Sequence, residues 1–304
     1  MSINIKKPKI IVIVGPTASG KTALSIELAK RFDGEVISAD SRQVYRGLDI
    51  GSGKVTRDEM RGVPHHLLDV ADPKTVYTVA DFVRDGRKAV EDITARGKVP
   101  VVVGGTFFYT DALLGKVSMP EIAPNEKLRE ELEKKNVEEL FALLSEKDLA
   151  RARTIDKDNP RRLVRALEIV DAVGVVPDNI REELYEILTL GISIPKEELH
   201  KNIRERLTKR MGAGMLEEVE GLVRGGVSYE RLESFGLEYR YVAEYLQHKI
   251  TEEEMLSLIE TKSRQFAKRQ MTWLKRDGSI VWVSPEEIEK MEELVRGFVS
   301  GVSK

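Results

Sequence analysis

IIVIVGPTASGKT, at Ile10–Thr22, is the stretch around which the rest of the chain can be understood. Five apolar residues run into the pattern G-x-x-x-x-G-K-[ST], and apolar residues at helical spacing follow it. The stretch therefore predicts a buried strand, a phosphate-binding loop and a helix. Glycines at both ends let backbone N–H groups turn toward a phosphate, and the helix directs its positive N-terminus at the same place. The predicted phosphate-binding residues are Gly15, Pro16, Thr17, Ala18, Ser19, Gly20, Lys21 and Thr22.

Two side chains of this loop carry the expected chemistry. Lys21 supplies a positive charge to the phosphate oxygens, and the hydroxyl of Thr22 is the predicted metal ligand, for Mg²⁺. The agreement of strand, loop and helix argues against a glycine-rich turn that binds nothing. The loop by itself does not identify the phosphorylated molecule.

Length and composition narrow the class of protein. The chain has 304 residues, of which 41% are hydrophobic and 33% are charged, enough for one large or two ordinary domains. The net charge of −2 indicates that any nucleic-acid surface is a local patch, and the lack of cysteine excludes disulfides and thiolate metal sites. No apolar run reaches about 18 residues, so we expect a soluble cytoplasmic protein without a membrane span.

Two further strand ends point to the same place as the phosphate loop. Residues 34–40 and 98–103 read as buried strands; the first ends at Asp40, and the second runs into GGT at 104–106. Because parallel strands present ligands at their carboxyl ends, Asp40 and Thr106 are expected beside the loop. Asp40 is then a Mg²⁺ partner, a general base or a helix cap, and Thr106 either contacts a substrate or caps a helix.

The alternation of strands and helices predicts an α/β fold, a P-loop NTPase-like parallel sheet flanked by helices, with an all-helical insertion domain. We expect the P-loop core to span residues 1–115 and the insertion, which shows no strand pattern, to span residues 116–185. Residues 186–304 return to the core. They begin with a strand, continue with one helix from about 196 to 223, and end with a helix capped at Ser284.

A basic helix is predicted over residues 251–276, because Thr251-x-x-Glu254 forms a capping box at its start. Its basic side chains lie opposite its apolar face, and no carboxylate falls between residues 263 and 276. A solvated helix face is the plainer interpretation, but the missing carboxylates favour a helix that binds a polyanion. The apolar face comprises Met255, Ile259, Phe266 and Trp273, and the basic stripe comprises Arg264, Lys268 and Lys275.

Three polar clusters leave alternatives open. The arginines that follow Asn159-Pro160 form a lid over a phosphate, a nucleic-acid contact or an ordinary surface. One of the arginines at 204, 206 and 210 is expected to reach the leaving phosphates. The pair His65-His66 lacks the further ligands of a zinc site and has a structural or substrate-loop role. The first cluster comprises Arg161, Arg162 and Arg165.

Taken together, these segments resemble the tRNA dimethylallyltransferase (tRNA isopentenyltransferase) family, and the match runs in order along nearly the whole chain. The resemblance implies transfer of a dimethylallyl group from dimethylallyl diphosphate to N6 of the adenosine just 3′ of the anticodon in tRNA, with Mg²⁺. The insertion would grip the anticodon stem, and we expect a monomer. The segments that carry the resemblance are GPTASGKT at 15–22, DSRQVYRGLDIGSGK at 40–54, VPHHLLD at 63–69, GGTFFY at 104–109, NPRRLVRALEI at 159–169 and RQFAKRQMTWLKR at 264–276.

The resemblance also assigns roles to residues. Lys21, Thr22 and Arg206 would bind and neutralise the diphosphate, Asp40 would accept the proton from N6, and Thr106 would position Asp40 or the adenine. The target base would flip out of its stack to enter the site. The tRNA-binding residues that the family implies are Asp40, Ser41, Arg42, Gln43, Thr106, Arg129, Arg161, Arg162, Leu163, Val164, Arg165, Arg264, Lys268 and Lys275.

The chain departs from the family pattern at Arg161, Asn202 and Leu237, where the family usually has Gln, Arg and Tyr. Three rival functions remain. An isopentenyltransferase of free adenine nucleotides would not need the insertion or the basic helix. A small-molecule kinase would bind MgATP without RNA, and a regulatory nucleotide-binding protein would leave Asp40 without a role.

Overall fold

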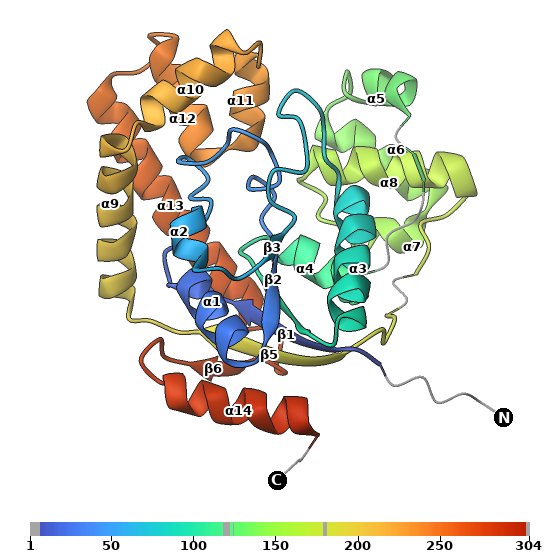
Figure 1. The fold of residues 1–304 in the computed structure, drawn as a ribbon. Helices are drawn as coiled ribbons and strands as arrows, with labels where there is room; N and C mark the ends of the chain where they lie inside the picture. The colour runs from blue at the N-terminus through green and yellow to red at the C-terminus, as the bar shows by residue number, and fades with distance from the viewer. Residues whose placement is uncertain (1–6, 118–121, 124, 179–180, 302–304) are drawn as a thin grey trace, which may run out of the picture. The chain divides into compact units, whose positions relative to one another are not determined.

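The structure is a computed structural model that describes residues 7–117, 122–123, 125–178 and 181–301. Its centre is a six-stranded sheet in the order β3-β2-β4-β1-β5-β6, with every neighbouring pair parallel (Figure 1). The P-loop NTPase-like fold expected from the sequence is therefore confirmed. The strands are β1 (Lys9–Val14), β2 (Gly34–Ser38), β3 (His65–His66), β4 (Val99–Val103), β5 (Glu186–Ile192) and β6 (Val281–Val283).

Helices cover both faces of the sheet. In β1, side chains alternate between the faces: Ile11 and Ile13 pack with α1 and α14, whereas Ile10 and Val12 pack with α3 and α4. A strand buried on both sides must be apolar at every position, which explains the unbroken run that precedes the phosphate loop. These helices are α1 (Lys21–Arg31), α3 (Val79–Ala95), α4 (Phe107–Leu113) and α14 (Ile288–Ser300).

The chain divides into two compact units. Unit 1 comprises Met1–Gly115 and Glu183–Lys304 and contains the sheet, and unit 2 comprises Lys116–Glu182. Unit 2 is helical in its described part and has its own apolar core, in which Leu140 and Leu163 are buried. Its helices are α5 (Glu126–Leu132), α6 (Val137–Lys147), α7 (Leu149–Ala152) and α8 (Pro160–Val173).

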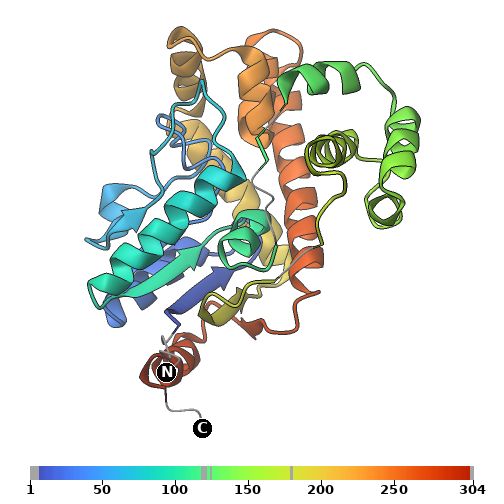
Figure 2. The ribbon, with the colours of Figure 1, turned by 90° about the vertical axis from the view of Figure 1, so that its right-hand side faces the viewer.

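The helices between Lys196 and Leu274 build a second core around Tyr239 and Met255, whereas Met60 of the short helix α2 packs against the core at Ile11 and Ile13. Figure 2 shows α13 as the long orange helix that runs past the sheet, beyond the carboxyl ends of β1 and β4. None of the helices in the described residues is long and apolar enough to cross a membrane. These helices are α2 (Arg57–Met60), α9 (Lys196–Gly212), α10 (Met215–Arg224), α11 (Tyr229–Phe235), α12 (Leu237–Leu246) and α13 (Glu252–Leu274).

Two helix predictions are wrong in their bounds. The single helix expected from 196 to 223 is broken into α9 and α10, because Gly214 adopts a left-handed conformation with φ of 98°. The last helix begins at Ile288 rather than after Ser284, whose side chain accepts a hydrogen bond from Glu286 N within a turn. Apolar spacing and capping residues therefore predicted these helices but not the turns at Gly214 and Ser284 that set their ends.

The apolar face predicted for α13 is also wrong in its second half. The buried positions continue from Met255 and Ile259 through Ser263, Ala267 and Gln270, while the ring-bearing Trp273 is 45% exposed. Small residues are buried here because α13 packs closely against α9 and α12. The capping box at Thr251 is present as predicted, with Thr251 Oγ1 accepting from Glu254 N.

Candidate active site

A cleft of about 590 Å³ lies at the carboxyl ends of β1, β2 and β4. Unit 1 alone provides its walls: the phosphate loop, the ends of two strands, the loop from Asp49 to Thr56, and side chains of α9 and α13. The five residues with predicted chemical roles all line it. They are Lys21, Thr22, Asp40, Thr106 and Arg206.

The phosphate loop has the charge distribution of an anion site. Lys21 Nζ donates to the carbonyl oxygen of Pro16 at 2.6 Å, within the loop that it serves. Burial, followed by the nearby charge of Arg206, lowers the pKa of Lys21 to about 7, and the charge of Asp40 acts in the opposite direction. A bound anion would reverse this shift, because it would supply the negative charge that the buried ammonium lacks.

Arg206 is the arginine that faces the phosphate loop. Its Nη2 donates to Thr17 Oγ1 at 2.7 Å. Burial, followed by the neighbouring charge of Arg210, lowers the pKa of Arg206 to about 10, so the guanidinium stays charged at neutral pH. The other two arginines of α9 are engaged elsewhere: Arg204 pairs with Glu260 at 3.1 Å, and Arg210 is held by Glu238.

Asp40 is fixed through one carboxylate oxygen. Its Oδ1 accepts from the backbone N–H groups of Arg42, at 2.9 Å, and Gln43, at 3.4 Å. In the described part of the chain, Oδ2 has no hydrogen-bond partner, and Asp40 is half-buried in the wall of the cleft. The turn therefore orients the carboxylate and leaves one oxygen available to accept a proton.

Thr106 contacts the chain next to Asp40. Its Oγ1 accepts from Ser41 N at 3.3 Å and donates to Ser41 Oγ at 3.4 Å. It precedes α4, but its side chain makes no capping hydrogen bond to that helix. The structure thus favours a contact with the Asp40 segment over the helix-cap alternative.

The segment that follows Asp40 is tied to several elements. Gln43 Nε2 donates to Gly53 O at 3.2 Å, and its Oε1 accepts from Ser38 Oγ at 2.9 Å. Arg42 Nε donates to Phe235 O at 2.6 Å, so that side chain is directed toward α11. Of the four residues at 40–43 that the resemblance assigns to tRNA, Asp40, Arg42 and Gln43 line the cleft.

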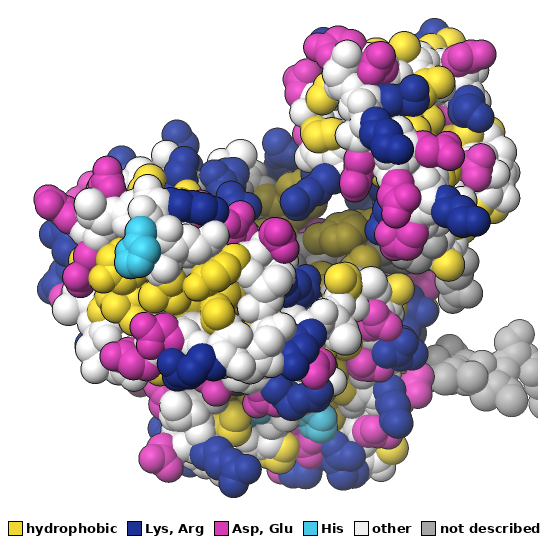
Figure 3. All heavy atoms as spheres, turned by 90° about the horizontal axis from the view of Figure 1, so that it is seen from above, with side chains coloured by type: hydrophobic (Ala, Val, Ile, Leu, Met, Phe, Trp, Pro, Cys, Tyr) yellow, Lys and Arg dark blue, Asp and Glu magenta, His cyan; other side chains and the backbone are white. Residues whose placement is uncertain are grey.

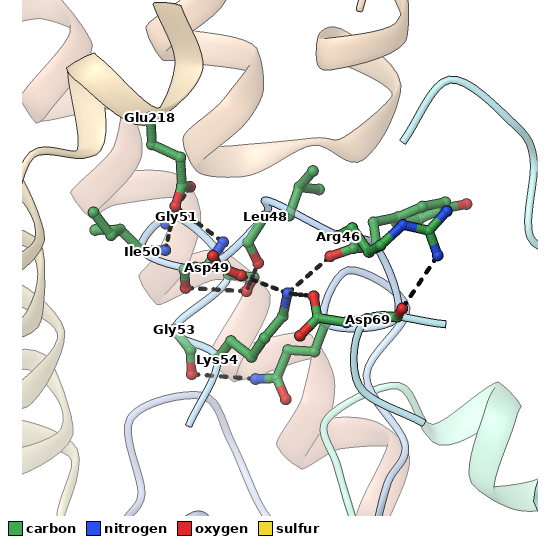
Figure 4. A network of polar contacts seen from close by, with 12 residues as sticks. Arg46, Leu48, Asp49, Ile50, Gly51, Gly53, Lys54, Asp69 and Glu218 are labelled. Atoms are coloured by element: carbon green, nitrogen blue, oxygen red, sulfur yellow. Dashed lines mark hydrogen bonds and ion pairs between the residues drawn. The ribbon is translucent and has the colours of Figure 1, made fainter. Parts of the chain in front are cut away.

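One wall of the cleft is a loop that sequence reasoning did not assign. Glu218 of α10 accepts hydrogen bonds from the backbone N–H groups of Asp49, Ile50 and Gly51 at 2.6–3.0 Å (Figure 4). Lys54 Nζ donates to Tyr45 O and to the carboxylates of Asp49 and Asp69. Because side chains pair with the backbone N–H and carbonyl groups of this loop, the loop can keep one conformation without regular secondary structure.

Two other polar residues of the cleft, Glu238 and Gln270, were missed as site residues. Arg210 and Glu238 form a buried ion pair at 2.6 Å, and Gln270 of α13 contacts two loops at once. The sequence did contain a signal for Gln270, because it falls on the buried phase of a helix, where an amide must find partners. The partner of Arg210 lies 28 residues away on another helix, so spacing gave no signal for that pair.

The basic stripe of α13 is only partly free. Contrary to the expectation of locally unpaired charges, Arg264 forms an ion pair with Glu260, one turn earlier. Lys268 and Lys275 are exposed and have no ion pair among the described residues. Trp273, which falls between them in the sequence, is also exposed, and Arg276 lies over its ring at 5.8 Å. On the face seen in Figure 3, acidic and basic side chains are interspersed.

Unit 2 holds the other residues that the resemblance assigns to tRNA. Arg129 and Arg165 both pair with Glu168, at 2.8 and 3.4 Å, so their guanidinium groups already have a partner. Arg161 and Arg162 are exposed at the start of α8. The side chains of Leu163 and Val164 pack in the core of unit 2, so any contact that these two residues make with RNA would involve their backbone.

The histidine pair has structural partners. His66 Nε2 donates to Glu35 Oε2 at 2.7 Å, and His65 Nδ1 donates to Val63 O at 2.8 Å. No group of three or more His, Cys, Asp or Glu side chains in the described ranges is arranged to hold a metal ion. The donor set near the phosphate loop suits Mg²⁺ bound mainly through phosphate oxygens, because Thr22 presents an exposed hydroxyl at the cleft.

Comparisons with known proteins agree with this geometry. A family model described as IPP transferase matches residues 43–277, and one described as isopentenyl transferase matches residues 8–77. The tRNA dimethylallyltransferase of Bacillus mycoides (strain KBAB4) is 38% identical over 302 residues, which is 96% of this chain and 95% of the relative.

Two solved structures are similar over nearly the whole chain. The full-length tRNA isopentenylpyrophosphate transferase of Bacillus halodurans has a TM-score of 0.74 and 35% identity, and the match covers 97% of this chain and 98% of that one. A eukaryotic dimethylallyltransferase captured acting on tRNA has a TM-score of 0.85 and 28% identity, with 97% and 80% covered. The chain belongs to the IPP transferase family, as its motifs had indicated.

Proposed function

We propose that this protein transfers a dimethylallyl group from dimethylallyl diphosphate to N6 of the adenosine on the 3′ side of the anticodon in tRNA. The observation that carries the proposal is that one cleft contains both a site for the diphosphate and a carboxylate that can accept a proton. The phosphate loop, Lys21 and Arg206 form an anion site, and Asp40 offers a carboxylate oxygen without a partner among the described residues. Relatives named tRNA dimethylallyltransferase indicate the class of substrate.

The reaction breaks the bond between the allylic carbon and the diphosphate oxygen, and it forms a bond from N6 to that carbon. Negative charge grows on the leaving diphosphate as the bond breaks. Lys21 and Arg206, together with backbone N–H groups of the loop, stabilise that charge, which is commonly the largest contribution to such catalysis. The diphosphate departs with both electrons of the broken bond.

Asp40 takes the proton that N6 loses. An exocyclic amino group is a weak nucleophile because its lone pair is delocalised into the ring, so removal of a proton during attack lowers the barrier. The hydrogen bonds from Arg42 N and Gln43 N keep Asp40 Oδ1 occupied, so Oδ2 is the oxygen that would take the proton. Thr106 holds the adjoining residue Ser41.

Mg²⁺ fits the phosphate end of this site, where Thr22 would be its protein ligand and the diphosphate oxygens would complete its shell. When bound, the ion supplies positive charge against the leaving group. The lack of a carboxylate cluster in the described residues is compatible with this, because Mg²⁺ at phosphate sites commonly keeps few protein ligands.

RNA recognition is proposed for exposed cations outside the cleft. Lys268 and Lys275 of α13 and Arg161 and Arg162 of α8 are exposed, and they would contact backbone phosphates. The target adenine must leave its stack to reach a carboxylate in the wall of a cleft, so base flipping is part of the proposal. A free nucleotide would need neither set of cations.

A transfer assay tests the proposal. Purified protein and Mg²⁺ are incubated with radiolabelled dimethylallyl diphosphate and either bulk tRNA or AMP. Label in tRNA alone supports the proposal. Label in AMP assigns the protein to the free-nucleotide enzymes, and label in neither acceptor rejects prenyl transfer to adenine and makes MgATP binding the next measurement.

A further inference from the structure

A single buried amide joins the two halves of the candidate site. The side chain of Gln270 is 4% exposed, on the face of α13 that packs inward. Its Oε1 accepts from Thr17 N at 2.7 Å, and its Nε2 donates to Gly105 O at 2.9 Å. A buried amide is costly unless both of its ends are paired, and here the two ends are paired to two different loops.

Each contact leads to one half of the reaction. Thr17 belongs to the phosphate loop, and its Oγ1 also accepts from Arg206. Gly105 precedes Thr106, whose hydroxyl contacts Ser41, the neighbour of Asp40. The amide of Gln270 is therefore the link between the loop that would hold the diphosphate and the segment that would hold the base.

The fit around this amide leaves little freedom. A Cβ atom added to Gly105 would lie 2.7 Å from Gln270 Nε2, closer than side-chain carbons come to such an atom, so the glycine allows the amide to reach the carbonyl group. Glutamate at position 270 could not donate to Gly105 O at neutral pH. Methionine has a similar length but could pair with neither loop.

We propose that Gln270 is a positioning residue that couples diphosphate binding at the phosphate loop to the alignment of Asp40 and hence to binding of the target adenosine. The inference rests on the proposed function, because it concerns the same cleft. Gln270 acts through Thr17 and Gly105. Diphosphate bound in the phosphate loop holds Thr17 in place, and the hydrogen bonds of the Gln270 amide then hold the 104–106 segment in place as well. Coupling of this kind is reciprocal, so each ligand tightens the binding of the other.

The test measures the coupling directly. The dissociation constant of an anticodon stem-loop RNA is measured with and without saturating magnesium pyrophosphate, in the wild type and in Gln270→Met. We expect pyrophosphate to tighten RNA binding several-fold in the wild type, and we expect this factor to fall toward one in the variant. Turnover should drop by at least about tenfold, because small misplacements of reacting groups are costly.

A merely structural role predicts a different result. Loss of packing would lower the melting temperature and weaken both ligands, but it would leave the coupling factor unchanged. Gly105→Ala breaks the same link from the other side and provides a second variant if Gln270→Met does not fold. Gln247→Met is the matched control, because the amide of Gln247, the residue just after α12, donates to Ala243 O of that helix and makes no hydrogen bond to another element among the described residues.

The outcomes separate this inference from the proposed function. An unchanged coupling factor in Gln270→Met and Gly105→Ala, or no coupling in the wild type, overturns the inference even if prenyl transfer is robust. Loss of coupling in both variants, with the factor retained in Gln247→Met, supports it. Failure of the wild type to transfer the dimethylallyl group to tRNA would reject the proposed function, whatever the coupling factor is.

Discussion

At the scale of single residues, Asp40 gives the sharpest prediction. Replacement by Asn keeps an oxygen that can accept from Arg42 N and Gln43 N, so the turn should survive, but the side chain can no longer take a proton. We expect Asp40→Asn to lose turnover by about 10²-fold or more while RNA affinity stays close to that of the wild type. Single-turnover transfer and RNA binding by filter retention measure the two quantities.

The matched control is Asp92→Asn, which changes an exposed carboxylate on α3. Its turnover should equal that of the wild type. Near-normal turnover in Asp40→Asn would refute the role of Asp40 as general base and would leave its position in the cleft to be explained by the turn alone.

Lys21 gives a pH dependence whose sign is fixed. Its pKa is lowered to about 7, mainly by burial, so at pH 8 about nine-tenths of the free protein lacks this proton. Bound pyrophosphate stabilises the protonated form of Lys21, so binding at pH 8 should be accompanied by uptake of a proton by Lys21. Affinity for pyrophosphate should therefore fall as the pH rises through 7. Calorimetry at pH 8 in buffers of different ionisation enthalpy measures the uptake.

Lys21→Arg corrects for protons exchanged by pyrophosphate itself, because a guanidinium remains charged at this pH. The wild type should take up roughly 0.9 proton more than this variant. Equal uptake in the two proteins would show that Lys21 is already protonated before the ligand binds.

At the scale of elements, α13 presents different groups on two faces. Its inner face brings Gln270 to the cleft, and Lys268 on its outer face and Lys275 just after its last residue are exposed. Neutralisation of both lysines with Gln should weaken RNA binding and reduce the slope of log K against log salt by about 2, roughly one for each phosphate that is no longer neutralised. Titration of RNA at several salt concentrations gives the slope.

The control replaces two exposed lysines of other helices, Lys30 of α1 and Lys88 of α3, with Gln. It has the same net charge as the test variant, so a general electrostatic effect would appear in both. An unchanged slope in the α13 variant would mean that this helix face is only solvated. Arg264→Gln should have a smaller effect, because Glu260 already pairs with Arg264.

At the scale of the whole molecule, the two units have separate cores, and their stabilities should respond separately. Glu168 of unit 2 is buried and accepts from Arg129, Asn125 N and Arg165. We expect Glu168→Gln to destabilise unit 2 by about 1–3 kcal/mol, because one carboxylate satisfies several donors. Pyrophosphate binding in unit 1 should be unchanged, as measured by calorimetry.

The same carboxylate predicts a loss of stability in acid. Burial acts to raise its pKa, but the hydrogen bonds from Arg129 and Asn125 N outweigh burial and hold the pKa of Glu168 below its ordinary value of 4.5. Its contribution is therefore complete above pH 4.5 and is lost as the pH falls below that value. Denaturant unfolding at pH 7 and pH 3.5 should show a smaller gap for Glu168→Gln than for the wild type. Glu146→Gln, on the exposed face of α6, is the control.

Local sequence pattern was enough to predict the central strands of the sheet and the loop after β1, but it did not predict the two-residue strand β3. The apolar run before Gly15 has to be a strand covered on both faces, and the loop that follows builds its ligand contacts from adjacent backbone groups. Asp40 and Thr106 could be placed beside that loop because parallel strands end at one edge. These inferences depend on local pattern and on one general property of parallel sheets, and the structure confirms where the strands lie.

Which distant groups meet depends on the fold alone. From the residues alone, Arg206 could not be separated from Arg204 and Arg210, because their partners Glu260 and Glu238 lie on other helices. Gln270 contacts Thr17 across 253 positions. A hydrogen bond over that separation leaves no periodic trace in the chain, because the fold, rather than residue spacing, brings its donor and acceptor together.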